Sequence, residues 1–274
     1  MKLRKFEFEY AQIDTNLKIT RYRSQAELFT EDLGNGVVLE MVAIPGGSFI
    51  MGSPENEAGR DDYESPQHQV TIQPFYIGKF TITQEQYAAV MGTNPSRFPG
   101  KKRPVEKVSW NDAVEFCAIL SNKTGKKYQL PSEAQWEYAC RAETKTPFNF
   151  GETITTDLAN YNGNFTYGSA PKGKYRQETT NVGSFPANAF GLHDMHGNVW
   201  QWCDDNWHGN YINAPTDGSS WLCDNDNIKC LRGGYWFYNP EFCRSAYRGI
   251  HNRAERAFHH DPFGFRVVCV FGRT

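Results

Sequence analysis

The sequence has no long run of apolar residues. Residues 1–5 carry lysine and arginine, and an alternating segment, residues 6–10 (FEFEY), follows them directly. A secretory signal peptide needs a continuous apolar segment of roughly 7–15 residues, and a membrane-spanning helix needs about 18 or more. The sequence therefore predicts neither a signal peptide nor a membrane span, and we expect the protein in the cytoplasm.

Paired cysteine motifs are also absent. The seven cysteines include no Cys-x-x-Cys pair, and their number is odd. This argues against a zinc site or a complete set of disulfides. In a reducing compartment we expect the thiols to be mostly reduced and buried. A disulfide between Cys223 and Cys230 is the alternative.

A strong excess of one charge is the third absence. The formal net charge is -2 and the sequence pI is about 6.4. Proteins that bind nucleic acids without sequence preference usually present a basic surface. We therefore expect no general nucleic-acid binding.

Aromatic residues and glycine are abundant instead. Aromatics make up 15% of the 274 residues, and there are 24 glycines. From about residue 145 onward the chain is rich in Asn, Gly, Asp and aromatics and shows little helical periodicity. This composition predicts a globular chain with long structured loops that large side chains hold in place.

Alternating apolar residues predict strands near the amino terminus. Residues 6–13 and 18–28 form a predicted hairpin with a turn at 14–16, and we assign residues 1–36 to a hairpin extension. Residues 37–274 form the main domain, which opens with a strand at 37–44, a turn at 45–47 and a second strand at 48–52.

Three short amphipathic helices are predicted from their capping residues. Each predicted start is a Ser or Thr, followed three residues later by a side chain that can bond back to it. The pairs are Thr83 with Gln86, Ser109 with Asp112, and Ser132 with Gln135. Such brief helices are stable only when they pack on a core.

Several phrases occur in a specific order along the chain. They are residues 41–53 (MVAIPGGSFIMGS), 104–110 (PVEKVSW), 130–137 (LPSEAQWE), 191–202 (GLHDMHGNVWQW), 232–234 (RGG) and 264–266 (GFR). Together they resemble the formylglycine-generating, sulfatase-modifying family from about residue 37 to the end. The resemblance implies an α+β, C-type-lectin-like fold with few short helices, much irregular loop structure and often bound calcium.

The same resemblance bears on catalysis. Catalytic members have two cysteines, five residues apart, after the Arg-Gly-Gly phrase, and these bind copper as thiolates. Here Cys243 matches the second cysteine, but Tyr238 occupies the first position. A phenol does not replace a soft thiolate for copper(I). We therefore predict that the protein is not an enzyme, with a copper-dependent oxidase as the alternative.

Residues 235–260 combine a regular skeleton with side chains of unrelated chemistry. The skeleton is Trp236, Pro240, Cys243, Arg244, Ser245, Ala246, Arg248, Arg253 and Arg256. The interleaved residues are Tyr235, Phe237, Tyr238, Asn239, Glu241, Phe242, Tyr247, Gly249, Ile250, His251, Asn252, Ala254, Glu255, Ala257, Phe258, His259 and His260. This layout, over about residues 231–271, resembles the bacterial variable proteins that retroelements diversify.

The interleaved residues are predicted to form a binding surface. Aromatic residues bury much area with few rotatable bonds and often anchor interfaces. We expect their rings to face outward, while Trp236 and the regularly spaced arginines belong to the scaffold. The predicted function is non-catalytic binding of an unidentified protein or other macromolecule. An invariant signalling module, or an ordinary aromatic core, is the alternative.

A calcium site is implied by the family resemblance. Asn160, Asn198 and Gln201 match positions where family members bind calcium through oxygen atoms. The family usually has Glu at the position of Gln201, so one negative charge is missing. A network of Asn side chains in turns is the alternative.

Copper binding tests the non-catalytic prediction. With one thiolate in place of two, we expect copper(I) to bind the wild type no more tightly than it binds the Cys243→Ser variant, and neither protein to oxidise a thiol-containing peptide. Copper titration and mass spectrometry of the peptide measure both. Tight copper binding that the substitution removes would show that the chain is an oxidase.

Overall fold

The chain begins with a long antiparallel hairpin. The computed structural model describes residues 2–224, 227–252 and 262–270, and its first two strands are β1 (Arg4–Ile13) and β2 (Ile19–Gly34). On β1, Phe6 and Phe8 point into the core. β2 continues beyond its predicted end at residue 28, because its second half pairs with β3 (Val37–Ile44). Both predicted strands of the hairpin are therefore present, and the hairpin is continuous with the main sheet.

The main sheet has six strands in the order β1-β2-β3-β6-β12-β7. β6 is Phe75–Gly78, β12 is Val268–Cys269 and β7 is Tyr128–Gln129. β12 pairs with both β6 and β7. Residues near the carboxyl terminus therefore lie in the same sheet as the first strand, β1. A separate two-stranded sheet consists of β4 (Gly47–Met51) and β5 (His68–Ile72), and a 3-10 turn at Asp62–Glu64 lies between them in the sequence.

A four-stranded sheet carries the carboxyl-terminal part of the chain. Its order is β10-β9-β8-β11, with β8 at Trp200–Asn206, β9 at Ile228–Arg232, β10 at Gly249–Asn252 and β11 at Phe263–Phe265. Residues 263–269 do not form one continuous strand. The chain leaves the four-stranded sheet at Phe265 and enters the six-stranded sheet at Val268, and the fully buried side chain of Arg266 lies between the two.

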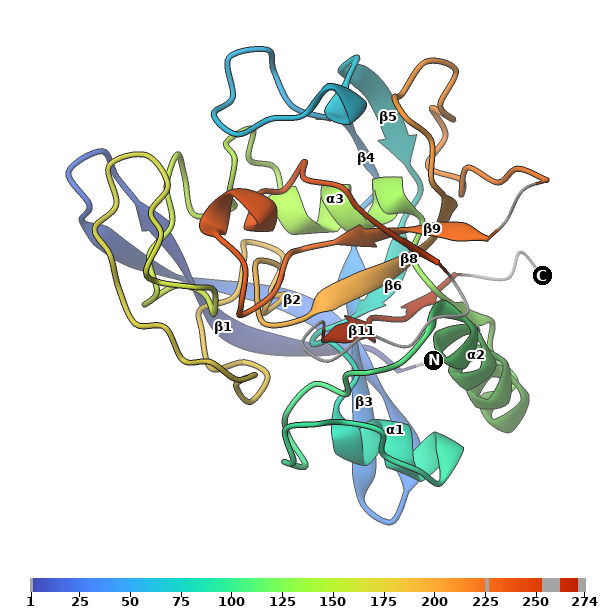
Figure 1. The fold of residues 1–274 in the computed structure, drawn as a ribbon. Coiled ribbons are helices and arrows are strands. Elements are labelled where there is room, and N and C mark those ends of the chain that lie inside the picture. Colours follow the sequence, from blue (N-terminus) through green and yellow to red (C-terminus); the bar gives the residue numbers. More distant parts are fainter. Residues whose placement is uncertain (1, 225–226, 253–261, 271–274) are drawn as a thin grey trace.

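The three predicted helices are confirmed. They are α1 (Gln84–Met91), α2 (Trp110–Thr124) and α3 (Glu133–Arg141), and a capping box begins each one. The N-cap residues are Thr83, Ser109 and Ser132, whose side chains accept hydrogen bonds from the backbone three residues on. Figure 1 shows α3 near the centre of the molecule, with α1 and α2 below it.

Loops make up the chain between α3 and β8. Residues 142–199, all of which the structure describes, form only isolated bridges and no strand or helix. They run beside the β1–β2 hairpin at the left of Figure 1. Side chains hold these loops: the Asn188 side chain, for example, donates to Ala139 O at 2.6 Å and accepts from the backbone of Phe190 at 3.0 Å. The predicted loop character is confirmed.

The cysteines follow the predicted pattern. The structure describes all seven, none of them forms a disulfide, and all except Cys223 are buried. The alternative disulfide between Cys223 and Cys230 is wrong, since Cys230 lies in the core and its Sγ contacts Asn206 O at 3.4 Å. Among the described residues, no helix has the length and apolar character that crossing a membrane requires.

An aromatic cluster joins α2 to the four-stranded sheet, and its removal tests the fold. The Phe116 ring is fully buried and meets Phe265 edge to face at 5.2 Å between centroids. We expect Phe116→Ala to lower the free energy of unfolding by about 3–5 kcal/mol. Val38→Ala, at a position 48% exposed, should cost less than about 1 kcal/mol. Urea unfolding measures both, and equal losses would contradict the assigned core.

Candidate binding surface

A turn of two glycines starts the segment that the sequence singles out. Gly233 and Gly234 follow β9 with φ of 94° and 69°, in the left-handed region. A Cβ on Gly234 would lie 2.6 Å from the Sγ of Cys243, and one on Gly233 would lie 3.1 Å from the Trp136 ring. Glycine is required at both positions because the backbone conformation and the close approach both exclude a side chain.

Arg244 ties this segment to the loop between β4 and β5. The segment turns through a 3-10 helix at Pro240–Cys243, and Arg244 follows it directly. The Arg244 guanidinium donates to both oxygens of Glu64, at 2.8 and 2.6 Å, and also to Glu57 at 2.5 Å. All three side chains are almost fully buried.

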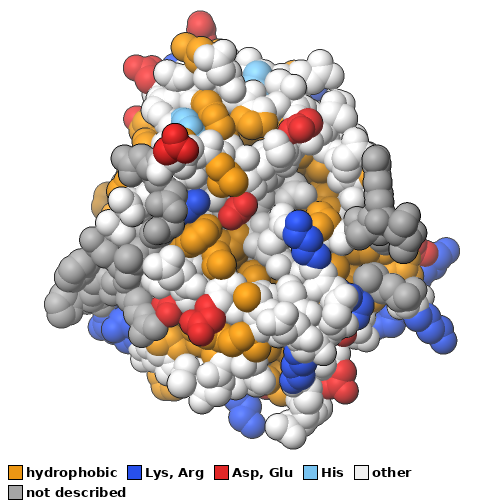
Figure 2. Space-filling model, turned by 90° about the vertical axis from the view of Figure 1, so that its right-hand side faces the viewer, with side chains coloured by type: hydrophobic (Ala, Val, Ile, Leu, Met, Phe, Trp, Pro, Cys, Tyr) orange, Lys and Arg blue, Asp and Glu red, His pale blue; other side chains and the backbone are white. Residues whose placement is uncertain are grey.

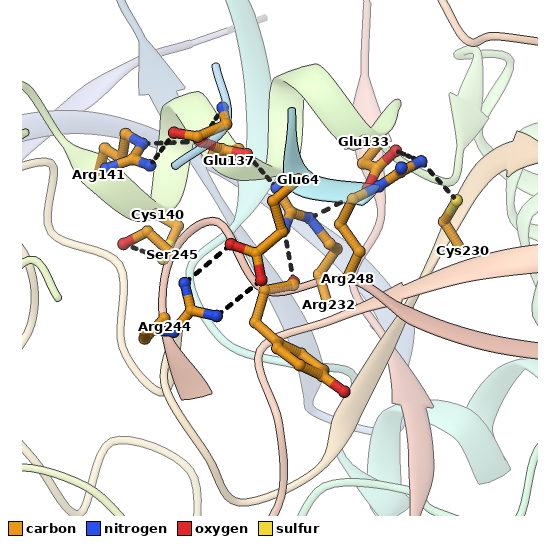
Figure 3. Close-up of polar contacts among 12 residues, drawn as sticks. Glu64, Glu133, Glu137, Cys140, Arg141, Cys230, Arg232, Arg244, Ser245 and Arg248 are labelled. Carbon is orange, nitrogen blue, oxygen red and sulfur yellow. Dashed lines mark hydrogen bonds and ion pairs between the residues drawn. The ribbon is translucent and has the colours of Figure 1, made fainter. Parts of the chain in front are cut away.

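Arg248 makes a second connection, to the start of α3. Its Nε and Nη2 donate to the two oxygens of Glu133 at 2.7 and 3.0 Å, and its Nη1 donates to the backbone oxygens of Tyr63 and His208. Arg232, at the end of β9, forms an ion pair with Glu137 one turn further along α3. Figure 3 shows these arginines converging on the carboxylates of α3 and Glu64. The scaffold role predicted for Arg244 and Arg248 is confirmed.

The charges in this network act on one another strongly. Burial raises the pKa of Glu133, but the charges of Arg248 and Arg232 outweigh it and hold the pKa below its usual value. For Glu57 the balance is opposite: burial raises its pKa more than Arg244 lowers it. Glu133 is thus held ionised between two arginines.

Burial separates the predicted skeleton from most of the predicted binding residues. Every described skeleton residue is buried, namely Trp236, Pro240, Cys243, Arg244, Ser245, Ala246 and Arg248. Among the interleaved residues, Phe237 and Ile250 are exposed, at 41% and 50%. Those of intermediate exposure are Tyr238, Asn239, Glu241, Phe242, Tyr247, His251 and Asn252.

Two interleaved residues are not at the surface. Tyr235 is 1% exposed, so the expectation that its ring faces outward was wrong. The glycine turn directs it back onto β8, where its ring lies 6.2 Å from Trp200 and 4.5 Å from Tyr238. Gly249 is also buried, with Trp200 and Leu231 within 3.2 Å of the position a Cβ would take.

The other aromatic rings are exposed only in part. Tyr238, Phe242 and Tyr247 pack on one another in sequence, with 4.9 Å between the centroids of each neighbouring pair. They therefore form a layer over the core, and among the described rings of the segment only Phe237 is exposed. Ala254, Glu255, Ala257, Phe258, His259 and His260 lie outside the described residues.

A small pocket lies beside these rings. It has a volume of about 220 Å³, and its walls include Tyr238, Tyr247, Ile250 and His251 from the segment together with Tyr63 and Trp200. A larger hollow of about 740 Å³ lies between the tip of the β1–β2 hairpin and residues 144–153, and none of the predicted binding residues that the structure describes lines it. Figure 2 shows one side of the molecule, on which hydrophobic side chains gather near the centre and lysines and arginines are scattered.

The position of the catalytic cysteine pair holds one thiol and one phenol. Cys243 is fully buried, and burial raises the pKa of its thiol far above the usual value. Tyr238, at the other position, belongs to the partly exposed aromatic layer. A thiol that stays protonated is a poor nucleophile and a poor metal ligand.

The predicted calcium ligands do not form one site. Gln201 Oε1 accepts hydrogen bonds from Trp136 Nε1 and from the Arg266 guanidinium, both at 2.8 Å, so a cation there would face a positive charge. Gln201 as a calcium ligand stays a prediction, and in this structure these two donors already occupy its side-chain oxygen. Asn160 donates to Asn198 Oδ1 at 3.1 Å, and that oxygen also accepts from the backbone of Thr180.

Of the side-chain oxygens of Asn160, Asn198 and Gln201, one accepts no hydrogen bond from the described residues. Among the described residues, none donates to the buried Asn160 Oδ1. Calcium takes six to eight oxygen ligands, usually with carboxylates among them, and this donor set does not fit it. Calcium at Asn160 and Asn198 remains a prediction, while the described side chains form the Asn network that was the alternative.

The fold and the segment together define the class of protein. The described residues form a mixed α+β fold with three short helices, long loops and a carboxyl-terminal segment held by buried arginines. This fold is a C-type-lectin-like domain of the formylglycine-generating type. Residues 26–270 match the family model described as a sulfatase-modifying factor enzyme 1-like domain. The chain belongs to this family.

Individual relatives include a protein named as an enzyme and one named as a variable protein. The chain is 28% identical to a formylglycine-generating enzyme of Thermomonospora curvata, over 74% of this chain and 84% of that protein. It is similar to the structure of PvdO from Pseudomonas aeruginosa, with a TM-score of 0.76, 35% identity, and coverage of 89% and 98%. It is also similar to Treponema denticola variable protein 1, with a TM-score of 0.73, 25% identity, and coverage of 88% and 98%.

The sequence alone does not single out the carboxylates that hold the arginines. Glu133 and Glu137 were visible within the phrase at 130–137, and Glu57 and Glu64 within an acidic loop. These glutamates lie far in the sequence from Arg232, Arg244 and Arg248. The smallest separation within a pair is 95 residues, between Glu137 and Arg232, so no local pattern connects the partners.

The network predicts a large difference between two arginines. Arg244→Met leaves Glu57 and Glu64 buried without their partner, and we expect a loss of about 3–5 kcal/mol in the free energy of unfolding at neutral pH. Arg60 forms an ion pair of 3.8 Å with the exposed Asp62, and Arg60→Met removes it. This substitution should lower the free energy of unfolding by less than about 1 kcal/mol. Chemical denaturation measures both.

The pH dependence of the Arg244→Met variant provides its control. An unpaired buried carboxylate has a raised pKa in the folded state, so its penalty is small at low pH, grows as the pH rises above the pKa of the unfolded chain, and levels off above the raised folded-state pKa. The difference from the wild type should therefore shrink toward pH 4. A difference independent of pH would mean that packing, and not charge, is what Arg244 provides.

Proposed function

We propose that the protein is a non-catalytic binding protein whose carboxyl-terminal segment contacts a macromolecular target and is diversified by a retroelement. The observation that carries this proposal is the match between burial and the sequence pattern. Every described skeleton residue is buried, whereas nine of the eleven described interleaved residues, all except Tyr235 and Gly249, are at least partly exposed.

Such a division suits a surface that has to vary. Buried positions with charge pairs tolerate little change, because an orphaned charge is costly. Exposed positions away from such features usually change stability by less than about 0.5 kcal/mol. A segment built in this way can change its outer side chains and keep its backbone. Likeness to Treponema denticola variable protein 1 supports this proposal.

A formylglycine-type oxidase is the second candidate, supported by relatives of that name. Tyr238 argues against this candidate, because its phenol occupies the position of the first thiolate in the catalytic members. The Cys243 thiol is held protonated by burial, which also disfavours copper binding.

The neighbouring DNA tests the retroelement proposal. We expect a near-copy of the DNA that encodes residues 231–271, close to a reverse-transcriptase gene, that differs from the coding copy only where the near-copy has adenine. The differences should fall in the codons of interleaved residues such as Phe237, Asn239 and Ile250, and not in those of Arg244 and Arg248. If independent isolates carried identical segments and no near-copy, the segment would be an invariant interaction module.

A further inference from the structure

The pocket beside the segment is surrounded by aromatic rings. Tyr63 meets Trp207 at 5.1 Å and Tyr247 at 6.3 Å between centroids, both edge to face. Trp200 lies 5.9 Å from Tyr247 and 6.3 Å from Tyr238, the latter again edge to face. All five rings line the pocket and form a continuous wall. Ring faces carry partial negative charge, so a cage of this kind attracts cations.

The volume of the pocket limits what it can take. Pockets for whole small-molecule ligands usually measure about 300–1,000 Å³, and this one measures about 220 Å³. It is therefore suited to one side chain of a larger partner. A single anchoring side chain in a well-packed pocket often dominates the affinity of a protein interface.

Carboxylates add negative charge at the same place. The Tyr63 hydroxyl donates to Asp61 at 2.5 Å, which draws electron density toward the ring and places a carboxylate behind it. Burial, followed by the charges of Asp61 and Glu64, raises the pKa of the Tyr247 hydroxyl. The loop at 53–67 has five carboxylates and one arginine; Glu57 and Glu64 pair with Arg244, which leaves three carboxylates against Arg60.

Carboxylates neutralise the positive charges of the two arginines near the pocket. Arg248 lines the pocket and lies 4.6 Å from the Trp207 centroid, and Arg244 lies 5.8 Å from that of Tyr247. Glu133 binds Arg248 through both oxygens, and Glu64 binds Arg244 in the same way. These contacts also show that rings of this wall accept a cation on one face.

We infer that the pocket binds a cationic side chain, lysine or arginine, of a protein target. The inference rests on the proposed function, because it names what the binding surface recognises. The ring wall supplies the attraction, and the acidic loop beside it supplies charge complementarity.

Choline and its uncharged isostere 3,3-dimethyl-1-butanol separate cation binding from simple apolar filling, because they differ in charge and hardly in shape. We expect the full-length protein to bind choline with a dissociation constant at least about tenfold lower than that of the isostere, which corresponds to 1.4 kcal/mol. Tryptophan fluorescence or NMR titration measures both. Equal affinity, or no binding of choline, would overturn the inference.

Variants locate the site. Tyr247→Leu should weaken choline binding at least about fivefold because it removes a ring, and Tyr247→Phe should retain it. Tyr22→Leu, which removes an exposed ring on β2, should have no effect. If Tyr247→Leu proves unfolded by circular dichroism, Tyr238→Leu replaces it. Choline binding that survives both ring removals would place the cation elsewhere and contradict the inference.

A separate measurement distinguishes this inference from the proposed function. Binders selected from a library of this protein against a defined panel of proteins should lose affinity when surface lysines and arginines of their target are neutralised. If binders depend on residues 235–252 but not on target cations, the inference fails and the proposed function stands. If binding does not depend on residues 235–252, both fail.

Discussion

The site depends on a set of buried ion pairs. Three arginines of the carboxyl-terminal part pair with glutamates of α3 and of the loop between β4 and β5. Arg232, Arg244 and Arg248 are fully buried. Buried ion pairs add little net stability, because desolvation offsets the attraction, but removal of one partner is very costly. Such pairs therefore select one geometry for a segment whose described residues form one short strand and a single 3-10 turn.

This constraint explains how a loop-rich chain can present a defined surface. Arg244 and Arg248 attach the segment to the buried glutamates. The two glycines after β9 form the turn at which the segment begins. Phe237 and Ile250 are exposed and carry no charge, so they are not part of the network. Their identity can change without a change in the network, as the proposed binding function requires.

Local features of the fold could be predicted from the sequence, and long-range ones could not. The capping residues Thr83, Ser109 and Ser132 gave the helix starts because capping depends on neighbours three residues apart. The skeleton arginines were recognised from their spacing, but their glutamate partners lie 115 to 187 residues away for Arg248 and Arg244. The burial of Tyr235 and the contact of Gln201 with Arg266 were missed for the same reason: both follow from how β8 packs against distant residues.

The most direct test of the account is a binding selection with the exposed positions randomised. A display library that varies Phe237, Asn239, Glu241 and Ile250, with the arginines and glutamates kept, is selected against several unrelated proteins. The account predicts folded members with thermal stability close to that of the wild type and a different set of binders for each target. Folded members that yield no specific binder, or a library that is mostly unfolded, would contradict it.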